Sequence, residues 1–190
     1  MHITMKTKLF ISAMVALCAM VFTGCKQDNV TEPDDPQPQP DTKAVAAVMQ
    51  IDLTVDAKTL ELFTVSFDYL DADGKKQTET VTATTWSKDI QTKSLPAKVG
   101  FCMNLAKKEG VDLSKYEQFT ISYRCPFSCY AVNAAGEAVS RPQKGEPNLT
   151  STLSISKIDA TLEAFANNPA GRSALYSFDA DGKVTSLDWE

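Results

Sequence analysis

Three cysteines in the second half of the chain, Cys102, Cys125 and Cys129, are the side chains best suited to covalent chemistry. Three thiols cannot all pair with one another, so one stays free or pairs between chains. In a straight strand, at about 3.3 Å per residue, Cys125 and Cys129 lie too far apart to bond, but a bend at Pro126 would let them meet. A disulfide between Cys125 and Cys129, a bridge from Cys102, and three reduced, buried thiols all remain open.

The only histidine in the chain is His2, close to the N-terminus. Ser-His-Asp and Cys-His catalysis, histidine-based zinc sites and histidine general bases are therefore excluded for the folded part. The 24 acids contain no local motif that would single out a pair for glycoside hydrolysis. We expect no catalytic residue, no metal site and no cofactor.

Another cysteine, Cys25, follows the one long apolar run of the chain. Two lysines precede Leu9–Phe22, which is apolar apart from one serine. A basic head and about a dozen apolar residues are typical of a secretory signal, and the run is too short for a comfortable membrane span. The small residues Thr23 and Gly24 supply the expected cleavage site.

The stretch Val21-Phe22-Thr23-Gly24-Cys25 resembles the lipobox of bacterial lipoproteins. The resemblance implies that the Cys25 thiol takes a diacylglycerol, that residues 1–24 are removed as a signal peptide, and that the new amino group is acylated. Two or more acyl chains anchor a protein stably, whereas one does so only marginally. We therefore expect a lipid anchor in the outer membrane of a Gram-negative bacterium.

Residues 25–43 form the lipidated cysteine and an acidic, proline-rich tether with four prolines and five acids. Such a segment cannot bury enough apolar surface to fold, and its prolines favour an extended spacer. Acids soon after the lipidated cysteine are found in surface lipoproteins of Bacteroidetes, which Lys26-Gln27-Asp28-Asn29 resembles loosely. Both surface and periplasmic display remain open.

The chain carries 19 bases against 24 acids and contains no basic run outside the signal. This charge argues against nucleic acid as a partner and against electrostatic binding to a membrane. The expected membrane contact is the lipid on Cys25 alone.

Asp-Ala-Asp-Gly occurs twice, at 71–74 and at 179–182. Calcium loops use spaced carboxylates before a glycine, but neither copy has the downstream glutamate of such loops. Asp-Gly between alternating runs is also a strong hairpin signal. We interpret both copies as turns.

Aromatic side chains are a second candidate for binding, since they could line a sugar or peptide site. Packing in the core explains them too. They are Trp86, Tyr116, Phe127, Tyr130 and Trp189.

Residues 44–190 show the pattern of one β domain. Strict alternation of apolar and polar residues over 49–55 predicts a half-buried strand. Apolar residues that share one face predict further strands over 60–70, 97–107 and 118–125. One helix is expected after Ser156 as its N-cap, because Ile158, Leu162 and Phe165 share a helical face. The fold class is therefore all-β: an antiparallel, immunoglobulin-like β-sandwich with one short helix in its C-terminal half. A lipocalin-like barrel is the alternative.

Three classes of function follow. The first is a non-catalytic binding or assembly module with a protein or glycan partner, since an exposed strand edge can recruit another strand. The second is a lipocalin-like carrier of a small apolar ligand, which requires a hollow barrel. The third is a carboxylate-dependent hydrolase of glycans, which requires two facing acids and a raised pKa.

Overall fold

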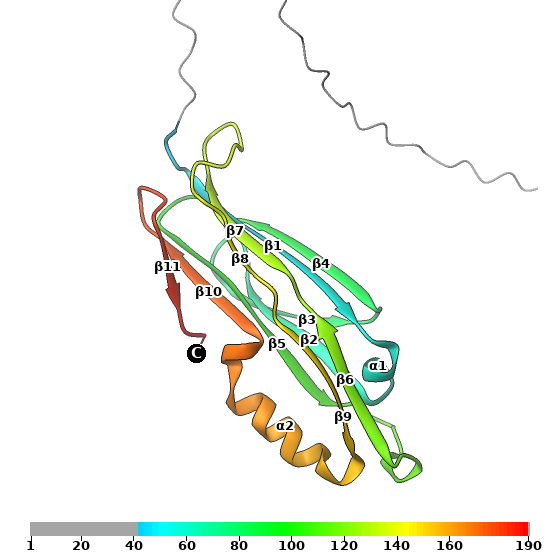
Figure 1. The fold of residues 1–190 in the computed structure, drawn as a ribbon. Coiled ribbons are helices and arrows are strands. Elements are labelled where there is room, and N and C mark those ends of the chain that lie inside the picture. Colours follow the sequence, from blue (N-terminus) through cyan, green and yellow to red (C-terminus); the bar gives the residue numbers. More distant parts are fainter. Residues whose placement is uncertain (1–41, 190) are drawn as a thin grey trace, which may run out of the picture. The chain divides into compact units, whose positions relative to one another are not determined.

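The computed structural model describes residues 42–189, which form two antiparallel β-sheets packed face to face (Figure 1). Sheet A consists of β1 (Ala46–Val55), β4 (Thr85–Gln91), β6 (Gln118–Arg124), β7 (Phe127–Val132), β8 (Gln143–Gly145) and β9 (Asn148–Ser154). Sheet B consists of β2 (Phe63–Leu70), β3 (Lys76–Val81), β5 (Ala97–Lys107), β10 (Ser173–Phe178) and β11 (Val184–Leu187). The helices are α1 (Ala57–Leu62) and α2 (Ile158–Asn167), with 3-10 turns at Leu113–Lys115, Ile155–Lys157 and Pro169–Gly171.

The two sheets remain separate. Sheet B has the order β11-β10-β5-β2-β3, and β1 in sheet A lies between β4 on one side and β6 and β7 on the other. The prediction of a β-sandwich is confirmed. The alternative of a lipocalin-like barrel is wrong, because the sheets do not close on each other.

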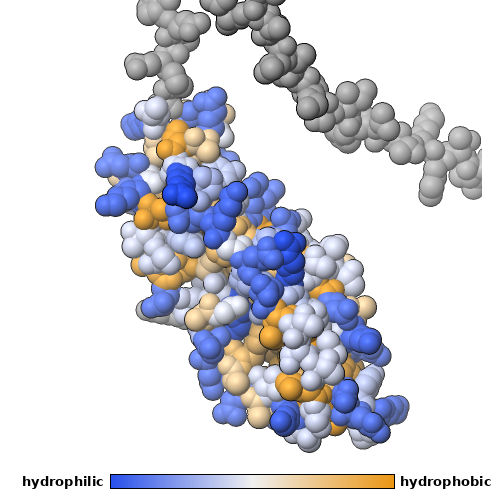
Figure 2. Space-filling view, in the orientation of Figure 1, coloured by the Kyte–Doolittle hydropathy of each residue, from blue (hydrophilic) through white to orange (hydrophobic). Residues whose placement is uncertain are grey.

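Large apolar side chains fill the space between the sheets. Strand alternation turns one residue in two inward, as the burial of β2 shows, where Phe63, Val65 and Phe67 are buried and their neighbours are not. The largest fully buried side chains are Phe63, Phe67, Phe101, Phe119, Phe178, Met49, Ile51, Leu53 and Met103. On the face that Figure 2 shows, apolar residues appear in small groups between hydrophilic ones.

Two strands of sheet A are interrupted at the same level. β6 ends and β7 begins around Pro126, and β9 and β8 are separated by Pro147. A proline has no N–H for the ladder, so each strand is broken there. The register nevertheless continues, because Arg124 faces Asn148 before the break and Phe127 faces Gly145 after it.

The sequence pattern over 60–70 predicted a strand from its first residue, but the chain first forms α1 and starts β2 at Phe63. Asp56 caps α1 by accepting a hydrogen bond from the Lys58 N–H at 2.8 Å. The buried Thr59 hydroxyl accepts from the Ser122 N–H at 2.8 Å, in place of a strand partner for β6. The short helix carries the chain from sheet A to sheet B.

The predicted C-terminal helix is confirmed as α2, with Ile158 buried and Leu162 and Phe165 packed against the core. The expected cap at Ser156 is wrong. Ser156 lies inside the 3-10 turn Ile155–Lys157, and the residue that precedes α2, Lys157, makes no side-chain capping bond. No helix in the described part of the chain is both long and apolar enough to cross a membrane.

Candidate functional site

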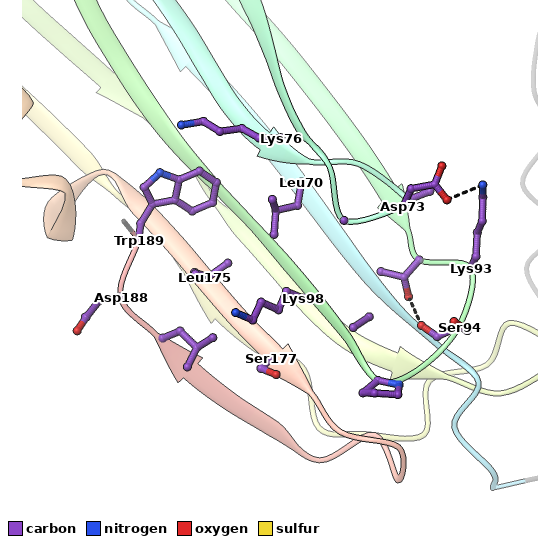
Figure 3. Close-up of a pocket in the computed structure, with 16 residues that line it drawn as sticks. Leu70, Asp73, Lys76, Lys93, Ser94, Lys98, Leu175, Ser177, Asp188 and Trp189 are labelled. Carbon is purple, nitrogen blue, oxygen red and sulfur yellow. Dashed lines mark hydrogen bonds and ion pairs between the residues drawn. The ribbon is translucent and has the colours of Figure 1, made fainter.

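The outer face of sheet B carries a groove with a volume of about 1030 Å³ (Figure 3). Trp189 lies at one end of the groove and the pair Asp73 and Lys93 at the other, with Lys98 between them. The lining residues come from five strands of sheet B, from the β2–β3 turn, from the loop before β5 and from the segment after β11. They are Leu70, Ala72, Asp73, Gly74, Lys76, Thr92, Lys93, Ser94, Pro96, Ala97, Lys98, Leu175, Ser177, Leu187, Asp188 and Trp189.

Gly100 shapes the floor of the groove. It faces Leu175 across the β5–β10 ladder, and a Cβ on Gly100 would lie 2.7 Å from Leu175 Cδ1 and 2.6 Å from the Ala174 carbonyl oxygen. Because Gly100 has no side chain, the Leu175 side chain can lie against the backbone of β5. Leu187 faces Leu175 from β11, so two leucines form an apolar base on the β10–β11 side of sheet B.

The groove has more positive than negative charge. Lys76 pairs with Asp68 at 3.0 Å, and Lys93 pairs with Asp73 at 2.6 Å, which raises the pKa of Lys93. Lys98 faces Ser177 in the ladder and makes no ion pair with any other residue in the described range. An unpaired ammonium group over an apolar floor attracts an anion.

Trp189 is the aromatic wall of the groove. Its ring lies 5.9 Å from the Lys76 ammonium nitrogen. Its indole N–H has no hydrogen-bond partner among residues 42–189, whereas the indole N–H of Trp86 donates to Glu79 at 2.8 Å. A bound molecule therefore has both the Trp189 ring and a free donor available to it.

The five aromatic residues that were candidates for binding lie in different parts of the structure and do not form one site. Trp86 stacks on Phe67 with ring centroids 4.5 Å apart, and Phe127 packs edge-on against Phe101 at 5.5 Å, so both are half-buried against the core. Trp86 points inward because the chain crosses from sheet B to sheet A between β3 and β4, which resets the alternation. Tyr116 donates to Glu61, and Tyr130 lies in β7 of the other sheet. Trp189 alone among the five lines the groove.

Both Asp-Ala-Asp-Gly stretches form the same turn. The Asp71 carboxylate accepts from the N–H groups of Asp73 and Lys75 at 2.9 Å each, and the Asp179 carboxylate accepts from the corresponding groups of the second copy at 3.0 and 2.9 Å. Gly74 and Gly182 have φ of 72° and 79°, which glycine adopts readily. The first aspartate of each copy is thus used within its own turn. In the range 42–189 no group of three or more His, Cys, Asp or Glu residues is arranged to hold a metal.

None of the carboxyl groups with a shifted pKa in the described range has the raised pKa that the hydrolase alternative requires. Where a carboxyl pKa is shifted within the described range, it is lowered, as at Glu79, whose carboxylate accepts from Lys88 and Trp86. The other acids with a lowered pKa are Asp68, Asp71, Asp112 and Glu146. Among the described residues, Asp73 and Asp188 are the acids that line the groove, and Asp188 points away from its interior (Figure 3).

The three cysteines of the domain are buried, free thiols. Cys125 and Cys129 lie four residues apart along one line of β6 and β7, whose register against β1 is unchanged across Pro126. That spacing corresponds to roughly 13 Å, so the possible disulfide between Cys125 and Cys129 is not formed. Of the three alternatives, the structure has the reduced, buried thiols. Cys102 lies in sheet B beside Arg172, whose Nη1 is 3.0 Å from Cys102 Sγ, so a bridge from Cys102 to Cys125 is not formed either.

We expect Cys102, Cys125 and Cys129 to be three free thiols when the chain is unfolded, and none of them to react quickly when it is folded. Burial raises the pKa of Cys125 and of Cys129 to about 12, so almost no reactive thiolate exists at pH 8. Titration with a thiol reagent, on protein with Cys25 replaced by serine, measures both states without reductant. A count of one thiol in denaturant would show that two of the three had paired.

Cys25 and residues 1–41 lie outside the described residues. The fold and its groove define the class of the described part as a β-sandwich domain with a surface groove. No family model matches the chain, and comparisons with curated proteins and with solved structures gave no match.

Proposed function

We propose that this chain is a lipid-anchored protein of the bacterial cell envelope, whose β-sandwich binds an acidic glycan in the groove on sheet B without catalysing a reaction. The observation that carries the proposal is the combination of Trp189, the unpaired Lys98 and an apolar floor in one groove. The anchor is supported by the lipobox-like stretch that ends at Cys25.

The charge of the groove supports an anionic ligand. The chain as a whole has a net charge of −5, yet the groove is lined by Lys76, Lys93 and Lys98 against Asp73 and Asp188. Concave sites with one prevailing sign of charge concentrate ligands of the opposite sign. A carboxylate placed between Lys98 and Ser177 would receive a charge-assisted hydrogen bond and a hydroxyl donor.

The position of the groove supports a sugar over an extended peptide. A peptide that binds to a sheet gains most from main-chain hydrogen bonds along a strand edge. The groove instead lies over the faces of the strands, where Leu70, Leu175 and Ser177 present side chains. A sugar ring can place its apolar face on the Trp189 indole and its polar groups toward the lysines.

Binding of galacturonic-acid oligomers by the mature protein tests this function. Trp189→Ala and Lys98→Gln are each expected to weaken binding by about tenfold or more, since stacking and a charge-assisted bond each contribute about 1.5 kcal/mol. Isothermal titration calorimetry measures the affinities. Lys144→Gln, a lysine on β8 in sheet A, is the matched control and should change nothing.

The same titration with methyl-esterified oligomers separates charge from shape. The ester keeps the sugar ring and removes its negative charge, so Lys98→Gln should no longer matter while Trp189→Ala still weakens binding. Equal affinity of the acidic and esterified oligomers, unaffected by both variants, would exclude the groove as the site.

Cys25→Ser is expected to abolish lipid attachment. Cells that express the full chain, grown with labelled palmitate, should label the wild type and leave the variant unlabelled, because serine cannot form the thioether. Cys18→Ser, a change within the expected signal peptide, is the control that should keep the label. Label retained in the Cys25→Ser protein would refute the anchor.

A further inference from the structure

Strand β9 (Asn148–Ser154) is an edge strand of sheet A, and it lacks the charged residues and prolines that usually prevent an edge from pairing with another strand. It pairs with β6 on one side and has no strand on the other within the described residues. Its seven residues, Asn-Leu-Thr-Ser-Thr-Leu-Ser, include no charge and no proline. Open, uncharged edges are the sites at which another strand adds to a sheet.

The other edges differ from β9. β3 carries Lys76 and Glu79, and β4 carries Lys88 and Asp89. β8 and β11 are three and four residues long. Charges and short length are the usual means of preventing edge pairing, so β9 is the exception among the edges in the described part.

The backbone of β9 shows which residues could pair with a new strand. The Pro147 carbonyl accepts from Cys125 at 2.8 Å and the Ile155 N–H donates to Glu117 at 2.9 Å, so odd-numbered residues direct their backbone groups to the strand beside β9. Even-numbered residues therefore direct theirs outward. The outward N–H and C=O groups of Thr150 and Thr152 have no partner within residues 42–189.

The sequence of β9 is nearly symmetric about Ser151. Leu149 mirrors Leu153, Thr150 mirrors Thr152, and two polar residues end the strand. We propose that β9 pairs antiparallel with β9 of a second copy of this chain, in a two-fold dimer centred on Ser151. In that register Thr150 of one copy faces Thr152 of the other, and each such pair exchanges both N–H···O bonds.

The side chains fit this arrangement. Leu149 and Leu153 are only half-buried in the single chain, and they face each other in the non-hydrogen-bonded pairs of the dimer, where side chains lie closest.

Sedimentation equilibrium of the mature chain carrying Cys25→Ser, which removes lipid as a cause of association, tests the dimer. We expect a monomer–dimer equilibrium. Thr150→Lys with Thr152→Lys places like charges in both cross-strand pairs and should raise the dissociation constant about tenfold or more. Both threonine side chains are exposed, so the single chain tolerates the change, and circular dichroism checks that it folds.

The matched variant, Thr150→Lys with Thr152→Glu, distinguishes the proposed register from any other. The side chain introduced by Thr150→Lys in each copy would then face the side chain introduced by Thr152→Glu in its partner, and dimerisation should return to at least the wild-type level. A wild type that stays monomeric up to millimolar concentration would overturn the proposal. So would a lysine pair that dimerises like the wild type, or a lysine–glutamate pair that fails to dimerise. Glycan binding in the groove does not enter this test, because β9 lies in the other sheet.

Discussion

Replacing Arg172 by methionine is expected to lower the free energy of unfolding by about 3–5 kcal/mol, because it leaves several buried acceptors without a donor. The Arg172 side chain is buried and lies between α2 and β5. It donates to the carbonyl oxygens of Phe165 at 2.8 Å and Ala166 at 3.1 Å, which lie in the last turn of α2 and lack partners within the helix.

The same guanidinium group also binds β5. It donates to the Met103 carbonyl oxygen and, at 3.0 Å, to the Asn104 side-chain oxygen. Its carbon lies 4.6 Å from the Phe165 ring centroid, which adds a cation–π contact. Arg172 thus holds the last turn of α2 to β5, and it does so directly before β10 begins at Ser173.

Urea unfolding followed by circular dichroism measures the Arg172 effect. Arg141→Met, at an exposed arginine, is the matched control and should change the free energy of unfolding by less than about 0.5 kcal/mol. If both variants unfold at the same urea concentration, Arg172 does not join α2 to sheet B.

Gly182→Ala is expected to lower the free energy of unfolding by about 2–4 kcal/mol. Its φ of 79° costs a residue with a Cβ about 1 kcal/mol. The added Cβ would also lie 2.6 Å from Ala44 Cβ and 3.0 Å from Ala131 Cβ, and overpacking of this kind costs about 1–3 kcal/mol. The β10–β11 turn therefore packs against the segment that precedes β1 and against β7.

Gly74→Ala separates the cost of the positive φ from the cost of the close contacts of an added Cβ. Gly74 occupies the same position in the same turn with a φ of 72°, but a Cβ there would meet no atom within 4 Å. Its replacement should cost about 1 kcal/mol, the conformational part alone. Equal loss of stability in the two variants, measured by urea unfolding, would show that the close approach at Gly182 has no energetic consequence.

Much of the fold follows from local patterns. Alternation in β1 and β2 predicts their buried faces, because a strand with one solvent face must alternate. The half-buried strand predicted over 97–107 is wrong in this respect, because β5 is central in sheet B and is buried on both faces from Val99 to Met103. Asp-Ala-Asp-Gly predicts two hairpins, since its first aspartate and its glycine satisfy the turn by themselves. Helix α2 follows from the spacing of Ile158, Leu162 and Phe165.

The groove could not be predicted in this way, because it depends on which strands become neighbours. Lys98 and Ser177 are 79 positions apart in the sequence and meet only through the β5–β10 register. Trp86 and Trp189 cannot be told apart by residue type. The crossing of the chain from β3 in sheet B to β4 in sheet A turns the Trp86 ring toward the core, and nothing local in the sequence predicts that crossing. The glycine inside β5, Gly100, was the available signal, since glycine within a strand often marks close approach of a neighbour.

The two tryptophans provide the most direct test of binding in the groove. A nitrogen-15 spectrum of the mature protein should contain two indole N–H signals, one from Trp86 bonded to Glu79 and one from Trp189 in the groove. On titration with a galacturonic-acid oligomer, we expect the Trp189 signal, assigned by its loss in Trp189→Phe, to shift with concentration while the Trp86 signal stays in place. A titration in which the Trp189 signal does not move would contradict the account.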